Sequence, residues 1–391
     1  MSRKGAFCAA AAVSFMFLTA KRYLQGATSD AIGDFVVLYD AWKAAAALWK
    51  ASYDSPTEIT DLNDILDLNM SAAPTSWQKI FDDTEAKKGW DSYRSKHSGA
   101  LTNIDWSKQW PHWLRARKAT KEATKDWVKD VLKAYAVAFN SHLRREIVLA
   151  ANLALAKATR SASASTESEQ QTLQSIKTKA AAAMCADTFS PDEAVKGCKP
   201  HASVISKQTT CTTGGSGKTG SSLALDMVCL CAAQTNAACR SADGGATELI
   251  ASSTDIPGNS QAAVAELCTA DSAFTVNQEA PNHIQGILNK LQSRIGLNIA
   301  ADAGGIAYVG KTKGTPCSDS NGNCLQYGDF FASGKKGIAS IPWADNLLAA
   351  GRVHQQLQIK KAEVANTRKQ LAEIKLHINS ALATPHPAPK R

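Results

Sequence analysis

A glycine-rich segment contains the residues most suggestive of chemistry in this chain of 391 residues. The segment CTTGGSGKTGSS covers residues 211–222, and its Gly217-Lys218-Thr219 run looks like the end of a phosphate-binding loop. That motif needs an earlier glycine at the position of Thr212, and a buried strand before the loop. The preceding HASVISKQTT is mostly polar. We therefore expect no nucleotide site, and a flexible Gly/Ser loop held on one side by Cys211.

Other catalytic patterns are absent from the sequence. The eight histidines are dispersed, and those at 112, 142, 354 and 377 fall on predicted helices without metal-ligand spacing. The sequence has neither paired carboxylates nor a Gly-x-Ser-x-Gly nucleophile elbow. We expect a protein that is not an enzyme and that carries no cofactor or metal.

The cysteines indicate disulfides in an oxidising compartment. Cys8 lies in an apolar N-terminal segment, and the CLC triplet at 229–231 lacks the Cys-x2-Cys spacing of zinc ligands. Nine cysteines remain, so one thiol is free or pairs with another chain. Their connectivity stays open, although the short CSDSNGNC loop favours a bond between Cys317 and Cys324. The nine candidates are Cys185, Cys198, Cys211, Cys229, Cys231, Cys239, Cys268, Cys317 and Cys324.

The N-terminus has the features of a secretory signal peptide. MSRKG is positively charged, and the apolar AFCAAAAVSFMFLTA that follows is short for a membrane span. We assign residues 1–26 to the signal, with an uncleaved membrane anchor as the alternative. In a secreted chain the Asn69-Met70-Ser71 triplet is a candidate glycosylation site on the surface.

The formal charge of +9 does not predict a nucleic-acid partner. Basic and acidic residues alternate along most of the chain, and the densest basic run, RARKATKEATK at 115–125, fits the solvated face of a helix. Aromatic-rich motifs of RNA-binding sheets are also absent from the sequence.

Three long helices are predicted to form the framework, over 29–50, 110–160 and 342–382. Residues 52–107, between the first two, are expected to be irregular with one or two short helices. In the last helix an apolar position recurs every seven residues, which indicates coiled-coil packing. The proposed packing seam comprises Ile32, Phe35, Tyr39 and Trp42 in the first helix, and Leu357, Val364, Leu371 and Ile378 in the last.

A different composition marks residues 185–335, which contain all nine cysteines and many glycines. We expect a loop-rich lobe here, crosslinked by disulfides. The fold class is therefore mainly α: an elongated antiparallel coiled coil or helix bundle, in which the first helix packs along the last, with a disulfide-rich lobe. The domain would cover 27–384 and leave 385–391 as a disordered tail.

Two segments and the order of elements resemble the N-terminal domain of B-type trypanosome variant surface glycoproteins. The segments are VCLCAAQTNAACRSADGG at 228–245 and CSDSNGNCLQYGDFFASGKKGIASIPWADNLLAAGRV at 317–353. The resemblance implies a homodimeric or trimeric coat protein on the cell surface, antigenically variable and exposed to host antibodies through its loops. In that case Lys218 and Thr219 would be solvent-facing residues at the tip of a glycine-rich loop. A receptor for a host serum protein on the same scaffold is the alternative.

The C-terminus departs from that family pattern. Family members continue into a small cysteine-rich domain and an apolar tail that is exchanged for a lipid anchor, whereas this sequence stops at the polar ATPHPAPKR. Membrane attachment is therefore expected only if a further C-terminal region exists.

Overall fold

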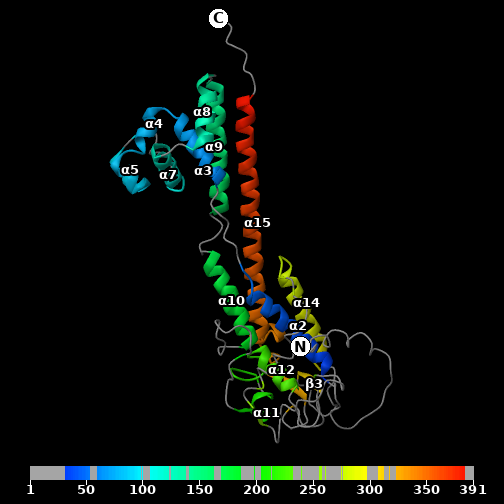
Figure 1. The fold of residues 1–391 in the computed structure, drawn as a ribbon. Coiled ribbons are helices and arrows are strands. Elements are labelled where there is room, and N and C mark those ends of the chain that lie inside the picture. Colours follow the sequence, from blue (N-terminus) through cyan, green and yellow to red (C-terminus); the bar gives the residue numbers. More distant parts are fainter. Residues whose placement is uncertain are drawn as a thin grey trace. The chain divides into compact units, whose positions relative to one another are not determined.

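A computed structural model gives the fold of the chain (Figure 1). The structure describes these residues: 31–52, 60–97, 99, 106–122, 125–137, 141–162, 169–185, 198, 204–212, 214–231, 239, 255–257, 260, 274, 276–296, 307–311, 317 and 323–383. The predicted signal peptide and the C-terminal tail lie outside them.

The chain is mainly helical, as predicted, and divides into two compact units. Unit 1 consists of residues 1–53 and 169–358, and unit 2 of residues 54–168 and 359–391. The elements of unit 1 are α2 (Ile32–Trp49), α10 (Glu169–Cys185), β1 (Val204–Ser206), α11 (Lys207–Thr210), α12 (Leu223–Cys231), β2 (Asp255–Pro257), α14 (Ala280–Arg294), β3 (Tyr308–Lys311), β4 (Asn323–Gln326), η4 (Gly328–Phe330), η5 (Gly337–Ser340) and the first part of α15 (Pro342–Ala383).

Helix α2 is central to unit 1. Its alanine-rich sequence favours a helix and lets neighbouring backbones approach closely. The helices α10, α12 and α14 all pack against it, so it is buried around most of its circumference and not along one seam. Of the predicted seam residues, Phe35, Tyr39 and Trp42 are buried and Ile32 is half-buried.

The strands of unit 1 form two small antiparallel pairs. β1 pairs with β2, and β3 pairs with β4 in a register that places Val309 opposite Leu325. Both of these residues are fully buried in the core that α2 shares. The pairs therefore attach the loop-rich lobe to the helices.

Unit 2 is built from short helices around α3. Its elements are α3 (Thr60–Ala72), α4 (Thr75–Ile80), α5 (Thr84–Lys88), α6 (Trp90–Lys96), α7 (Trp110–Glu122), α8 (Asp126–Val137), α9 (Ser141–Ala162) and the remainder of α15. The helices α7, α8 and α9 all pack against α3.

Two sequence predictions for this part of the chain were wrong. The single helix expected over 110–160 is assigned as three helices, α7, α8 and α9, and Lys125, between the first two, is not helical. The region 52–107, expected to be mostly irregular, contains four helices, since Pro74 and Gly89 separate short helices without abolishing them.

The sevenfold pattern of α15 is present in the structure, but it contributes to two cores. Leu357, Leu371 and Ile378 are buried and Val364 is half-buried. Leu357 belongs to the core of unit 1 with Phe35 and Trp42, as expected. Leu371 and Ile378 instead belong to the core of unit 2. The expectation that the first helix packs along the whole of the last one was therefore wrong.

Candidate functional site

The glycine-rich segment is packed and hydrogen-bonded, contrary to the prediction of a flexible loop with an exposed tip. Thr219 is fully buried, and its backbone N–H and its hydroxyl both donate to the carbonyl oxygen of Thr210, at 3.0 and 2.9 Å. Lys218 is half-buried, and a disulfide joins Cys211 to Cys229 of α12. The family resemblance led us to expect Thr219 in an exposed loop, but its small neighbours let the backbone pack tightly.

Gly220 fixes the end of this segment against two other elements. Its backbone N–H donates to the Asp226 carboxylate at 2.7 Å, and its carbonyl accepts from the backbone N–H of Trp343 at 3.2 Å. Its φ of 83° favours glycine, and a Cβ there would lie 2.6 Å from the Phe330 ring. The N–H and the carbonyl of Gly220 are both hydrogen-bonded within the protein, and the Phe330 ring fills the space beside its Cα. A phosphate would therefore find neither a free N–H nor room at Gly220.

Asp226 is the polar centre of this cluster, which we call the Asp226 cluster. Its carboxylate also accepts from the Tyr327 hydroxyl at 2.6 Å and from the Trp343 indole N–H at 2.7 Å. Complete burial raises the pKa of Asp226 to about 7, although its three hydrogen bonds act in the opposite direction. The cluster thereby links α12, the end of β4 and the start of α15.

Sequence reasoning missed the Asp226 cluster, although one signal was present. In LALDMVCLC, Asp226 is the only charged residue of a short apolar helix. A charged residue in such a setting is buried only when it has partners. The partners, Tyr327 and Trp343, are more than a hundred residues away, so the sequence did not identify them.

Four disulfides crosslink unit 1. They join Cys185 to Cys198, Cys211 to Cys229, Cys231 to Cys239, and Cys317 to Cys324. The bond between Cys317 and Cys324 confirms the one pairing favoured from sequence. The ninth candidate, Cys268, lies outside the described residues.

The dispersed histidines do not converge in the described part of the chain. No group of three or more His, Cys, Asp or Glu side chains that could hold a metal occurs among the described residues. Burial lowers the pKa of both His112 and His354, which favours neutral imidazoles. His377 lies exposed on α15, 3.8 Å from Glu146, and the side chain of His142 is outside the described set.

The structure argues against a glycan at Asn69. This residue lies within α3 and is only 8% exposed. A glycan must project into solvent, and a buried helical side chain offers no such path. The triplet suggested a surface site because such triplets accept glycans in secreted proteins, and the triplet itself does not indicate burial.

Unit 2 contains a network of ion pairs that the sequence did not reveal. Lys375 of α15 contacts Asp61 at 3.1 Å and Asp64 at 2.6 Å on α3. On the same helix, Asp67 pairs with Arg115 of α7 at 2.7 Å. Asp61, Asp64 and Asp67 are three residues apart, which places them along one side of α3. The spacing was visible in the sequence, but the partners depend on tertiary packing.

One face of α9 exposes apolar side chains. Val148, Leu149 and Leu153 are 40%, 55% and 49% exposed, whereas the opposite face, including Ile147 and Leu155, is buried in unit 2. A helix with apolar residues on two opposite faces has a second surface available for packing. None of the helices described is both long and apolar enough to cross a membrane.

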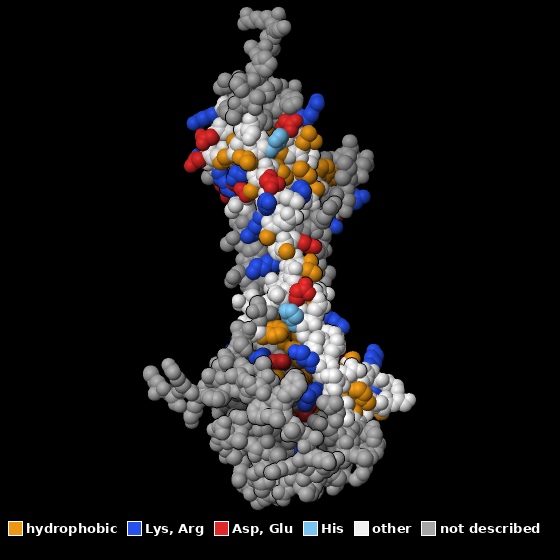
Figure 2. Space-filling model, turned by 90° about the vertical axis from the view of Figure 1, so that its right-hand side faces the viewer, with side chains coloured by type: hydrophobic (Ala, Val, Ile, Leu, Met, Phe, Trp, Pro, Cys, Tyr) orange, Lys and Arg blue, Asp and Glu red, His pale blue; other side chains and the backbone are white. Residues whose placement is uncertain are grey.

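On the face of the molecule in Figure 2, charged side chains of both signs are interspersed over the described residues of unit 2. A nucleic-acid site requires a continuous basic stripe. The basic run at 115–125 instead pairs with acidic residues: Arg115 with Asp67, and Arg117 with Asp82.

Comparison with known proteins identifies the family. Residues 13–373 match the B-type model of the trypanosomal VSG domain. The chain is 28% identical over 381 residues to variant surface glycoprotein WRATAT A of Trypanosoma brucei rhodesiense, covering 93% of this chain and 76% of that protein. It is also 28% identical over 349 residues to variant surface glycoprotein ILTAT 1.21 of Trypanosoma brucei brucei, covering 89% and 72% of the two chains. The family match spans both units, and the chain belongs to the family of trypanosomal variant surface glycoprotein domains.

Proposed function

We propose that this chain is a coat protein of the trypanosome surface, one copy of a dense and antigenically variable layer that shields the cell from host antibodies. The family match over residues 13–373 carries this proposal. The fold supports it, since covalent crosslinks stabilise unit 1 and do not depend on the identity of the loop residues between them. Surface location and passage through the secretory pathway accord with the relatives named above.

The coat function can be tested on living cells. Antibodies raised against the folded chain should label unfixed trypanosomes that express it, uniformly and at a density that hides other surface proteins. Repression of the chain should expose those proteins to their own antibodies unless another coat protein replaces it. Labelling that is sparse, or that appears only after permeabilisation, would contradict the proposal.

The coat copies are proposed to associate through the exposed face of α9. Leu149, Leu153 and Ala156 follow a spacing of four and three residues, which is the spacing of a coiled-coil seam, and Asn152 is the polar residue among them. A self-complementary helix face of this kind favours a second copy of the same chain. The partner would therefore be the chain itself, in a dimer or trimer.

Self-association is tested by mass measurement in solution. The wild-type chain should be oligomeric by light scattering, and the double variant L149E/L153E should be monomeric, because carboxylates at the seam would have to be buried. Leu376 provides the control, since it is 65% exposed on α15 and L376E should leave the oligomer intact. An oligomer unaffected by L149E/L153E would assign the contact to another surface.

Catalysis and ligand capture form no part of this proposal. The family is one of coat proteins, and the relatives carry names that refer to no enzyme activity and to no serum ligand. These names give the receptor alternative no support. Its test is a pull-down of host serum proteins, in which one saturable partner would revive it.

A further inference from the structure

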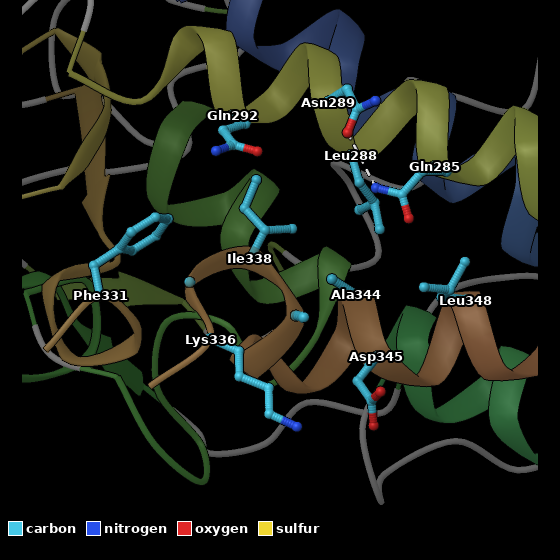
Figure 3. Close-up of a pocket in the computed structure, with 12 residues that line it drawn as sticks. Gln285, Leu288, Asn289, Gln292, Phe331, Lys336, Ile338, Ala344, Asp345 and Leu348 are labelled. Atoms are coloured by element: carbon cyan, nitrogen blue, oxygen red, sulfur yellow. Dashed lines mark hydrogen bonds between the residues drawn. The ribbon is translucent and has the colours of Figure 1, made fainter. Parts of the chain in front are cut away.

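A groove in unit 1 lies between α14 and the start of α15, and encloses about 230 Å³. Its floor is apolar and includes Leu288 of α14, Ile338 of η5 and Leu348 of α15. Figure 3 shows three amide side chains along α14 on one side of this floor, with Phe331 at one end. The groove belongs to unit 1, whereas the residues used in the proposed self-association belong to unit 2.

The amides on α14 offer hydrogen-bond donors and acceptors together. Gln285 donates through Nε2 to Oδ1 of Asn289 at 3.0 Å, which orients both amides. This bond leaves the Gln285 oxygen as an acceptor and the Asn289 nitrogen as a donor. Gln292, about one turn further on, adds another of each. All three side chains are exposed, so a ligand in the groove can reach them.

On the other side of the groove, the lining includes two side chains of opposite charge. These are Lys336 and Asp345, one cationic and one anionic, and both side chains point away from α14 (Figure 3). Since the amides are neutral, the rim carries no net charge and favours neither an anion nor a cation. Phe331, which is 39% exposed, offers a ring to an apolar face of the ligand.

These features specify one class of ligand. A hydroxyl group both donates and accepts a hydrogen bond, so it suits neighbouring amide oxygens and nitrogens. A sugar ring also has a C–H face that can lie on an apolar floor or an aromatic side chain. The volume is below the usual range for drug-sized ligands, about 300–1,000 Å³, and fits one ring. We propose that this groove binds a single neutral sugar residue, alone or at the end of a glycan.

Titration of the full chain with neutral methyl glycosides tests the proposal. The probes are the methyl glycosides of glucose, galactose, mannose and N-acetylglucosamine, followed by ligand-observed NMR and calorimetry. At least one should bind saturably with a Kd of about 1 mM, the range expected of so small a ligand. Absence of saturable binding for all four at about 50 mM would overturn the proposal.

Three variants locate any binding that is seen. N289A/Q292A should weaken it at least tenfold and keep the wild-type melting temperature, because both amides are exposed. F331A should weaken it severalfold. The control is K290A, an exposed residue of the same helix outside the groove lining, which should bind as the wild type does. If N289A/Q292A and F331A both bound the sugar as tightly as the wild type does, the assignment of binding to this groove would also be refuted. Neither result bears on the coat function, which is tested on cells.

Discussion

Unit 1 and unit 2 are both helical, but different interactions hold them together. The four disulfides of the described residues all lie in unit 1, and no cysteine occurs in residues 54–168 or 359–391. Unit 2 instead contains six of the nine tryptophans and the ion pairs of α3 with α7 and α15. Its six tryptophans are Trp77, Trp90, Trp106, Trp110, Trp113 and Trp127.

This contrast bears on how each unit tolerates sequence change. A disulfide stabilises mainly by restricting the unfolded chain, so it holds whatever loop it closes. Aromatic contacts such as the tilted pair of Phe81 and Trp110, with ring centroids 4.9 Å apart, depend on the side chains themselves. Loop substitutions should therefore be tolerated more readily in unit 1, where the glycine-rich segments lie, than in the core of unit 2.

Reduction of the disulfides should have the largest effect and should distinguish the two units. Loss of one native disulfide typically costs about 2–5 kcal/mol, and unit 1 would lose four. After reduction, hydrogen-exchange mass spectrometry should show lost protection in α10 and α12. Peptides from α3 and α7 should be unchanged. Equal loss of protection in α3 would mean that the two cores unfold together.

Replacement of Asp226 should have the next largest effect, again on unit 1. D226A leaves the Tyr327 hydroxyl, the Trp343 indole N–H and the Gly220 N–H without their buried acceptor. Each such orphan costs about 1–3 kcal/mol, so the unfolding free energy should fall by about 3 kcal/mol or more. D226N should cost less, because its carbonyl oxygen can still accept the Tyr327 and Trp343 bonds. Urea denaturation at constant pH measures both, and a smaller loss in D226A than in D226N would contradict this account.

Features that depend on local sequence were predicted correctly, whereas the packing partners of these features were not. Local patterns gave the sevenfold burial of α15, the crosslinked composition of 185–335 and the bond between Cys317 and Cys324. The partners of these patterns were not local. Leu357 and Leu371 occupy equivalent positions of the same sevenfold repeat, yet they lie in different cores. The repeat alone could not predict this difference.

The candidate sites were predicted less well, for a related reason. Asn69 was assigned to the surface from its glycosylation triplet, and Thr219 from the family resemblance of its glycine-rich loop, yet both are buried. A small hydroxyl is buried cheaply once its hydrogen bonds are satisfied, as those of Thr219 are by Thr210. Whether such partners exist depends on tertiary contacts, which composition does not report.

Acidification should act on stability in opposite directions through Asp226 of unit 1 and Asp64 of unit 2. The folded-state pKa of Asp226 is about 7, well above the ordinary value of 3.8, so between these values the native state binds more protons than the unfolded state. The unfolding free energy of unit 1 should therefore rise as pH falls from 7 to about 4, by about 1.4 kcal/mol per unit of pKa difference at most. Buried His354 opposes this change, because its lowered pKa makes protonation favour the unfolded state.

In unit 2 Asp64 contributes with the reverse sign, whereas Asp67, whose pKa is raised by burial, opposes it. Lys125 and Lys375 outweigh the effect of burial and hold the pKa of Asp64 below its ordinary value. The stability that Asp64 contributes is thus present above about pH 4 and is lost as pH falls further. Peptide-resolved hydrogen exchange under denaturant, corrected for the intrinsic rate at each pH, measures both units. D226N should abolish the rise in unit 1 and leave the loss in unit 2; a rise that persists in D226N would exclude Asp226 as its source.

Two arginines on α7 test how burial changes the contribution of an ion pair to the unfolding free energy. Their replacement should have the smallest of the predicted effects. Arg115 pairs with Asp67, whose side chain is 4% exposed, whereas Arg117 pairs through two nitrogens with Asp82, which is 26% exposed. R115A removes the principal partner of a buried carboxylate and should cost about 3 kcal/mol. R117A should cost about 1 kcal/mol despite its better geometry, because water and Lys121, 2.8 Å away, still solvate and neutralise Asp82. Urea denaturation of the two variants at low and high salt provides the measurement. If R117A proved the more damaging, bond geometry and not burial would control the stability of unit 2.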